Sequence, residues 1–383
     1  MGPDRDELPM DTLEVLRQRG SSKWVTYPAD VLPLTVAEMD FRLPPVVAEA
    51  LHRAVDRSDT GYASVASGLG AALAGFARRR WGWEVDPASV AAVTDVGTGV
   101  VQLLRVLTRP GDSVVINTPV YAPFFDWVPE AEGRLVDVPL AHTDAGWRLD
   151  LAALEVAFAA RPAVYILCNP HNPVGRVHTA AELAAVVGLA HTYGVTVIAD
   201  EIHGPLALPG ATFTPLLTVP GAADVVISVL SASKAWNLAG LKCAVVVTAS
   251  PAMASVVSRF PPDTRWRTGH FGVIAAIAAF SDGEEWLDRL LVSLESRRRE
   301  LGSLLAERLP AVTWRPPEAT YLAWLDCRAL GTGNEPRDLF LERGVALEAG
   351  PRFGAQGSGF VRLNFGTSAE ILDEAIARMA RST

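Results

Sequence analysis

The chain has 383 residues, of which 49% are hydrophobic and 20% charged, and its formal net charge is −9. This length and composition predict a large globular domain plus a smaller one, with apolar residues sufficient for a sizeable core. The negative charge, with basic runs no longer than residues 78–80 and 297–299, argues against nucleic acid as a partner.

The cysteines and the N-terminus indicate the compartment. Cys168, Cys243 and Cys327 are far apart in sequence and form neither a disulfide framework nor a metal-type CxxC motif, so we expect reduced thiols and no metal site. The first seven residues are acidic, and no apolar run approaches the length of a membrane span. The sequence therefore predicts a soluble, unprocessed, cytoplasmic protein with no membrane partner.

Short apolar runs rich in β-branched residues recur along the middle of the chain. They cover residues 113–117, 163–168, 195–199, 224–229 and 244–248. Such runs are typical of strands in a parallel sheet that helices cover on both faces. Between two of them, residues 179–193 have helical periodicity and end at Gly194, a suitable C-cap. This alternation predicts an α/β fold with a mainly parallel sheet.

The pattern changes near residue 282. A long amphipathic helix is expected at 286–308, followed by a Pro-rich segment at 315–318, an apolar strand at 321–326 and a last helix from Ser368. We therefore divide the chain into an N-terminal segment (1–45) that joins the smaller domain, a large domain (46–280) and a small α+β domain (281–383).

Polar segments follow three of the predicted strands directly. They are residues 169–176, 200–203 and 231–234. Ligands of open α/β sheets bind at the carboxyl ends of the strands, so we expect these three segments to converge on one site.

Lys234 and Asp200 are the principal candidates for catalysis. A lysine after a buried strand is partly desolvated, which lowers its pKa and allows its amine to condense with an aldehyde. Asp200 is suited to keep a pyridine nitrogen protonated, so that the ring accepts the electrons of a carbanion. The alternatives are a surface lysine for Lys234 and a helix N-cap for Asp200.

Candidate phosphate ligands occur in two places. Ser231 and Ser233 flank the lysine, and residues 97–101 open a helix whose free amides favour an anion. A glycine turn before a helix is common, so this segment alone is a weak signal.

Three further residues have both a functional and a structural interpretation. Asn172, between two prolines, offers an amide to a ring oxygen, or simply forms a tight turn. Tyr121 suits stacking on an aromatic cofactor, or core packing. Arg362 interrupts an apolar strand, where its guanidinium suits a substrate carboxylate or an internal salt bridge.

Together these motifs resemble the fold-type I, aspartate-aminotransferase-like enzymes that use pyridoxal phosphate. Within that superfamily the chain is similar to carbon–sulfur β-lyases of the MalY/PatB cystathionine β-lyase type, from about Arg17 to the last helix. The segments that carry the resemblance are residues 169–175, 200–203, 231–241, 320–327 and 359–364.

The resemblance implies a role for each candidate. Lys234 would hold the cofactor as a Schiff base, Asp200 would pair with the pyridine nitrogen, and Tyr121 would stack on the ring as part of the catalytic set. His203 stands where many superfamily members have tyrosine. The remaining implied cofactor contacts are Gly99, Val100, Val101, Asn172, Ser231, Ser233 and Lys242.

The resemblance also implies the substrate contacts and the assembly. Arg362 would bind the substrate carboxylate, with Ala37 and Asn172 beside it. Tyr62 would reach the phosphate of the partner subunit in a homodimer with shared active sites. Val25, Thr35 and Glu38 depart from the lyase pattern in the N-terminal signature, which leaves the identity of the substrate open.

The function implied is β-elimination from a cysteine S-conjugate such as cystathionine, which gives a thiol, pyruvate and ammonia. An aminotransferase would use the same residues up to the carbanion. A decarboxylating or oxidatively deaminating relative that acts on an S-conjugate is a further alternative, and a purely regulatory protein is a minor one.

Overall fold

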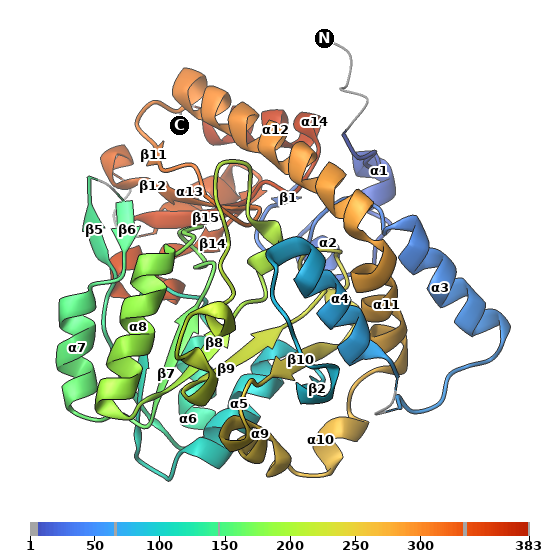
Figure 1. Cartoon of the computed structure of the whole chain (residues 1–383). Coiled ribbons are helices and arrows are strands. Elements are labelled where there is room, and N and C mark those ends of the chain that lie inside the picture. The colour runs from blue at the N-terminus through green and yellow to red at the C-terminus, as the bar shows by residue number, and fades with distance from the viewer. Residues whose placement is uncertain (1–6, 65–66, 145, 332–334, 382–383) are drawn as a thin grey trace.

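The computed structural model describes residues 7–64, 67–144, 146–331 and 335–381 (Figure 1). The acidic residues 1–6, on which part of the prediction of an unprocessed chain rests, lie outside this part. The chain is built around a seven-stranded sheet in the order β2-β10-β9-β8-β7-β3-β4. Its strands are β2 (Val90–Val93), β3 (Ser113–Ile116), β4 (Arg134–Asp137), β7 (Val164–Cys168), β8 (Thr196–Asp200), β9 (Val226–Leu230) and β10 (Ala244–Val247).

The α/β fold and all five predicted strands are confirmed, but one strand runs in the other direction. From β9 to β4 the neighbours are parallel, whereas β10 is antiparallel to both β9 and β2. A parallel return needs a crossover, usually a helix, and residues 231–243 between β9 and β10 contain only a short 3-10 turn at Ala239–Leu241. The chain therefore turns back beside β9.

Alternate residues of each strand face opposite sides of the sheet, so the core has two layers. Val115, Tyr165 and Val197 pack in one cluster with helices α4, α7, α8, α11 and α12. Ile116, Ile166 and Ile198 pack in the other, with α5, α6 and α9. The helix bounds are α4 (Leu69–Trp81), α5 (Val96–Leu107), α6 (Phe124–Glu130), α7 (Leu151–Ala159), α8 (Ala180–Tyr193), α9 (Pro251–Ser258), α11 (His270–Asp282) and α12 (Glu284–Arg308).

Helix α8 has the termini that its sequence predicts. The Thr179 hydroxyl accepts a hydrogen bond from the amide of Glu182, whose carboxylate in turn accepts from the Thr179 amide. The helix ends at Gly194, where φ is +70°, a conformation that glycine adopts without strain. Such a capping box satisfies backbone donors that the first turn leaves free.

A second, four-stranded sheet in the order β11-β12-β15-β14 forms the C-terminal part of the fold. Its strands are β11 (Thr313–Trp314), β12 (Leu322–Asp326), β14 (Glu348–Ala349) and β15 (Phe360–Asn364), and helices α13 (Pro336–Glu342) and α14 (Ala369–Met379) belong to the same part of the chain. The N-terminal strand β1 (Leu32–Pro33) pairs with β13 (Val345–Ala346), so the two ends of the chain meet here. The domain boundaries at 45 and 280 stay predictions.

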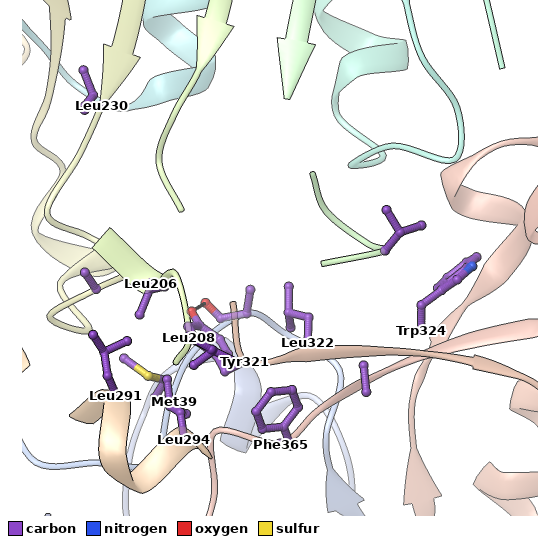
Figure 2. Close-up of a cluster of buried hydrophobic side chains, with 14 of the residues drawn as sticks. Met39, Leu206, Leu208, Leu230, Leu291, Leu294, Tyr321, Leu322, Trp324 and Phe365 are labelled. Atoms are coloured by element: carbon purple, nitrogen blue, oxygen red, sulfur yellow. Dashed lines mark hydrogen bonds between the residues drawn. The ribbon is translucent and has the colours of Figure 1, made fainter. Parts of the chain in front are cut away.

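The remaining elements complete the surface. They are the short helices α1 (Leu13–Leu16) and α2 (Ser22–Val25), helices α3 (Pro45–Asp56) and α10 (Asp263–Trp266), and the hairpin of β5 (Ala141–Thr143) and β6 (Gly146–Arg148). Figure 2 shows buried side chains from distant parts of the sequence in one cluster, among them Met39, Leu291, Leu294 and Phe365. This packing holds the N-terminal segment against α12 and the end of β15.

Candidate active site

A cavity of about 280 Å³ lies at one edge of the large sheet. Strands β2, β7, β8 and β9 all end at this edge, because β10 is antiparallel to both β2 and β9 and these two therefore run in the same direction. Most of the residues lining it lie at the ends of these strands or in the segments that follow them, as expected for a ligand site of an α/β fold. Tyr121 and Trp127 follow β3, and Ala37 comes from the N-terminal segment. The lining residues include Ala37, Asp95, Gly97, Tyr121, Trp127, Asn172, Asp200, His203, Ser233, Lys234 and Lys242.

Lys234 lines this cavity and differs from the other lysines of the chain. The sequence contains only Lys23, Lys234 and Lys242. Lys23 forms a buried ion pair with Asp40 at 2.8 Å, and Lys242 pairs with Asp95 at 3.1 Å, whereas the Lys234 amine donates to the carbonyl of Ala37 at 2.9 Å. Burial, with a smaller contribution from Arg362, lowers the pKa of Lys234 to about 8. About a tenth of the amine is therefore neutral and nucleophilic at pH 7, far more than for an ordinary lysine.

Asp200 is the last residue of β8 and its carboxylate is buried at the cavity wall. It accepts a hydrogen bond from the amide of Ile202 at 3.2 Å and does not cap a helix. Burial raises the pKa of Asp200 to about 7, against the opposing effects of that amide and of Lys234. A cationic ring nitrogen beside it would favour the ionised carboxylate, because opposite charges stabilise each other strongly where water is excluded.

His203 also lines the cavity and is fully enclosed. Burial, followed by the charges of Lys234 and Arg362, lowers its pKa to about 3, so the ring is neutral. Its Nδ1 atom is buried and has no hydrogen-bond partner among the described residues. A buried polar atom without a partner is unfavourable, so this atom suits a bound ligand.

The N-terminus of α5 forms one end of the cavity. Helix α5 begins at Val96 after the N-cap Asp95, and Asp95 and Gly97 line the cavity. The predicted contacts Gly99, Val100 and Val101 are buried deeper in the helix. The Gly99 amide is bonded to the Asp95 carbonyl at 2.9 Å, and its Cα faces Val93, Val229 and Val246 of the sheet. The amides that a helix leaves free belong to its first turn, which begins here at Val96, so Gly97 is a further candidate anion contact. Gly99, Val100 and Val101 stay predictions.

The two serines beside Lys234 have different surroundings. The Ser231 hydroxyl donates to the carbonyl of Cys243 at 2.7 Å and accepts from the amide of Ser233 at 3.1 Å, so it stabilises the turn after β9. Both serines line the cavity, and only Ser231 has its hydroxyl committed to the bonds just described. Ser233 is therefore better placed than Ser231 to offer its hydroxyl to an anion.

Arg362 lies behind the cavity wall, where it contacts Asn172. Its Nη1 donates to Asn172 Oδ1 at 3.1 Å and its Nη2 to the carbonyl of Thr35 at 3.0 Å, while the guanidinium lies over the Phe353 ring. Burial lowers the pKa of Arg362. No carboxylate within the described ranges forms an ion pair with it, so the internal salt bridge is not observed. The Glu348 carboxylate offsets part of the cost of burying this cation, and a ligand carboxylate in direct contact with the guanidinium would offset more.

The two tyrosines occupy very different positions. Tyr121 lines the cavity, and burial raises the pKa of its hydroxyl, so the phenol stays protonated. Tyr62 is 80% exposed and its ring contacts Trp266 edge-on on the surface. Within one chain Tyr62 is thus free to contact another molecule.

These residues fit pyridoxal phosphate. The Lys234 amine, with its lowered pKa, suits the aldehyde of the cofactor, and the buried Asp200 carboxylate suits the ring nitrogen. Tyr121 suits the face of the ring, and the N-terminus of α5 suits the phosphate. The unpartnered His203 Nδ1 is a further polar atom at this cavity. Within the part of the chain that the structure describes, no cluster of His, Cys, Asp or Glu could hold a metal ion. Nor is any described helix long and apolar enough to cross a membrane.

Sequence reasoning missed three features of the site. Asp95 caps α5 and pairs with Lys242, and Trp127 packs on Gly97, but neither residue type has a distinctive motif there. The carbonyls of Thr35 and Ala37 carry no residue-type signal at all. The scarcity of lysine, in contrast, can be read from the sequence, and it leaves Lys234 as one of only three candidates for a cofactor-binding lysine.

Known proteins are similar to this chain over nearly its whole length. The family model for aminotransferase class I and II matches residues 29–379. A putative cystathionine β-lyase of Mycobacterium tuberculosis is 46% identical, with 97% of each chain covered, and a cystathionine β-lyase of Corynebacterium glutamicum is 36% identical, with 96% and 98% covered. The crystal structure of a putative PLP-dependent β-cystathionase from Corynebacterium diphtheriae superposes with a TM-score of 0.93 at 36% identity, covering 97% and 98%. The chain therefore belongs to the aminotransferase class I and II family.

Proposed function

We propose that this protein is a pyridoxal-phosphate-dependent carbon–sulfur β-lyase that cleaves a cysteine S-conjugate of the cystathionine type. The observation that carries the proposal is the placement of Lys234, Asp200 and His203 around one cavity. The relatives named cystathionine β-lyase, at 36% and 46% identity, support the choice of reaction.

The residues have distinct tasks in this reaction. The cofactor, when bound, supplies an electron sink for the negative charge that develops at the substrate Cα. Lys234 would hold the cofactor through its amine and, as a free amine, would accept the proton from the substrate Cα. Asp200 keeps the ring nitrogen protonated, and Arg362 and Asn172 hold the substrate carboxylate. The C–S bond breaks with its electron pair leaving on sulfur as a thiolate, and water then releases pyruvate and ammonia.

The phosphate end is proposed to rest on the first turn of α5. The amides of Gly97 and Thr98, the Ser233 hydroxyl and the Lys242 amine provide donors at this end of the cavity. The Thr98 amide already donates to Asp95 at 2.8 Å, so Asp95 and the phosphate would compete for this turn. Lys242 balances part of that negative charge.

A homodimer completes the site in this proposal. Tyr62 and Trp266 are large aromatic residues exposed on one surface and in contact with each other. Exposed aromatic side chains of this size are enriched at protein interfaces. Tyr62 would contact the phosphate bound by the partner subunit.

The alternative with a specific basis is transamination, because Lys234, Asp200 and Arg362 would serve it equally. The two reactions differ only after proton removal from Cα, so the products distinguish them. Purified holoenzyme is incubated with cystathionine without any 2-oxo acid. We expect pyruvate, ammonia and a free thiol in equal amounts. Turnover that depends strictly on an added 2-oxo acid would identify an aminotransferase instead.

A further inference from the structure

The segment 35–40, which we call the strap, runs past Lys234 without regular secondary structure. Its backbone carbonyls are nevertheless satisfied one after another by side chains. The carbonyl of Thr35 accepts from Arg362, and that of Val36 accepts from Asn364. The carbonyl of Ala37 accepts from both Lys234 and Tyr321, and that of Glu38 from both Asn364 and Lys23. The carbonyl of Met39 accepts from Asn237, and that of Asp40 from Arg19. Irregular backbone that is buried needs such partners, and here the partners include two proposed active-site residues.

Asn364 holds the strap on both sides of Ala37. It lies on β15 two residues after Arg362, so both side chains project from the same face of the strand. Its Nδ2 donates to the carbonyls of Val36 and Glu38, each at 2.7 Å, and its Oδ1 accepts from the amide of Gly366 at 2.8 Å. The side chain is completely buried. All of its polar atoms are thus committed to fixing the backbone around Ala37.

The carbonyl of Ala37 is the atom that this arrangement orients. It accepts from the Lys234 amine at 2.9 Å and from the Tyr321 hydroxyl at 2.8 Å. A carbonyl in this position fixes the direction of the amine and stabilises its protonated form, because an ammonium is the stronger donor.

Asn237 braces the strap from the opposite side. It lies three residues after Lys234, and its side chain both accepts from the Met39 amide at 3.0 Å and donates to the Met39 carbonyl at 2.8 Å. Its φ of +59° is a left-handed conformation that asparagine tolerates better than most residues. The loop carrying the lysine and the strap are thereby joined directly.

We propose that Asn364 and Asn237 are positioning residues that hold the strap so that the Ala37 carbonyl directs the Lys234 amine. The inference rests on the proposed role of Lys234 as cofactor anchor and base. Neither asparagine touches the cavity, so each acts through the strap. Loss of either side chain lets the Ala37 carbonyl move and leaves the amine without a fixed partner.

The test measures the reactivity of Lys234 as well as turnover. In the full-length, cofactor-free chain, labelling of each lysine by an amine-specific reagent is followed against pH by peptide mapping. The charged groups that act on Lys234 are Arg362 on β15, Glu38 on the strap, Asp200 on β8 and Lys242 before β10. His203, Tyr321 and Tyr121 are the neutral titratable neighbours. Neither Asn364→Ala nor Asn237→Gly changes any of these charges.

We expect the labelling midpoint of Lys234 to fall by about half to one pH unit in Asn364→Ala, because the ammonium loses its carbonyl partner. In the holoenzyme we expect kcat to fall at least about tenfold while the cofactor stays bound. Asn237→Gly keeps the left-handed backbone accessible and should give a smaller shift in the same direction. If Asn364→Ala does not fold, the labelling midpoint of Lys234 in Asn237→Gly tests the proposal instead.

Ser293→Ala is the matched control. The Ser293 hydroxyl, on α12, accepts a hydrogen bond from the amide of Leu8 at 2.8 Å. This contact fixes a different part of the N-terminal segment, which does not line the cavity. We expect the substitution to lower thermal stability without moving the Lys234 midpoint. A midpoint unchanged in folded Asn364→Ala and Asn237→Gly would overturn the proposal, even if turnover fell. Because the labelling needs neither cofactor nor substrate, failure of the lyase assignment would leave this result interpretable.

Discussion

At the residue scale, the environment of Lys234 rather than its motif gives it a function. Burial lowers the pKa of Lys234 to about 8, against an ordinary lysine value of about 10.4. The sequence predicted the lysine, Asp200 and Arg362, because each is a polar residue at a strand end or inside an apolar strand. It could not predict that Arg362 lacks an ion-pair partner, since that depends on every side chain packed around it.

The lowered pKa has a measurable consequence. The rate at which the cofactor-free chain captures pyridoxal phosphate should rise with pH up to about 8 and then level off, because only the neutral amine reacts. The reaction is stopped at intervals with borohydride and the trapped product is quantified. A simple lysine derivative measured in parallel should keep accelerating to about pH 10. The same behaviour in the protein would mean that the amine is not desolvated.

Two substitutions should separate anchoring from substrate binding. Lys234→Ala should lose both the visible cofactor absorbance and β-elimination. Arg362→Ala should keep the absorbance but raise KM for cystathionine about 10- to 100-fold, since an ionic hydrogen bond contributes about 1.5–3 kcal/mol. Absorbance spectra and steady-state kinetics check both variants. An unchanged KM in Arg362→Ala would assign the substrate carboxylate to another residue.

At the element scale, the strands and their polar ends could be read from the sequence, whereas the exact start of α5 could not. The apolar run at β10 does not reveal its direction, because periodicity is the same in parallel and antiparallel strands. The predicted anion contacts begin at Gly99, whereas the helix begins at Val96 after Asp95, an N-cap with no distinctive motif. The resemblance pointed to Ala37, Thr35 and Glu38 of the strap, but not to the hydrogen bonds of its backbone carbonyls, because those do not depend on residue type.

The observed start of α5 predicts that Gly97 contributes to cofactor binding. A Cβ on Gly97 would lie 2.9 Å from Trp127 Nε1, so Gly97→Ala must displace either the indole or the first turn. We expect the affinity for pyridoxal phosphate to fall about tenfold, which corresponds to about 1.4 kcal/mol. Fluorescence titration of the cofactor-free chain measures it.

Gly188→Ala provides the control for this substitution. Gly188 lies inside α8, and a Cβ there meets nothing within 4 Å. We expect it to stabilise the chain by about 0.5–1 kcal/mol without changing cofactor affinity. Equal affinities for all three proteins would refute the placement of the phosphate at this turn.

At the scale of the whole molecule, the family relationship covers almost the entire chain, and the shared-site dimer follows as a proposal. Tyr62 is exposed and does not line the cavity of its own chain. Its ring contacts Trp266 edge-on at the surface. A site built from two subunits can be tested by complementation, because each defective chain carries what the other lacks.

Tyr62→Ala and Lys234→Ala chains, each weakly active or inactive alone, should regain part of the wild-type activity when unfolded together and refolded as mixed dimers. In a mixed dimer one site combines an intact Lys234 with the intact Tyr62 of its partner. Activity is compared with that of each variant refolded alone. If mixing restores nothing although mixed dimers form, Tyr62 acts within its own chain or not at all.

The covalent position of the cofactor tests the central claim most directly. The holoenzyme is reduced with borohydride, digested, and its lysine-containing peptides are examined by mass spectrometry. With only Lys23, Lys234 and Lys242 in the chain, the assignment is unambiguous. We predict the phosphopyridoxyl group on Lys234 alone. Its presence on Lys23 or Lys242, or its absence from all three, would contradict the proposed active site.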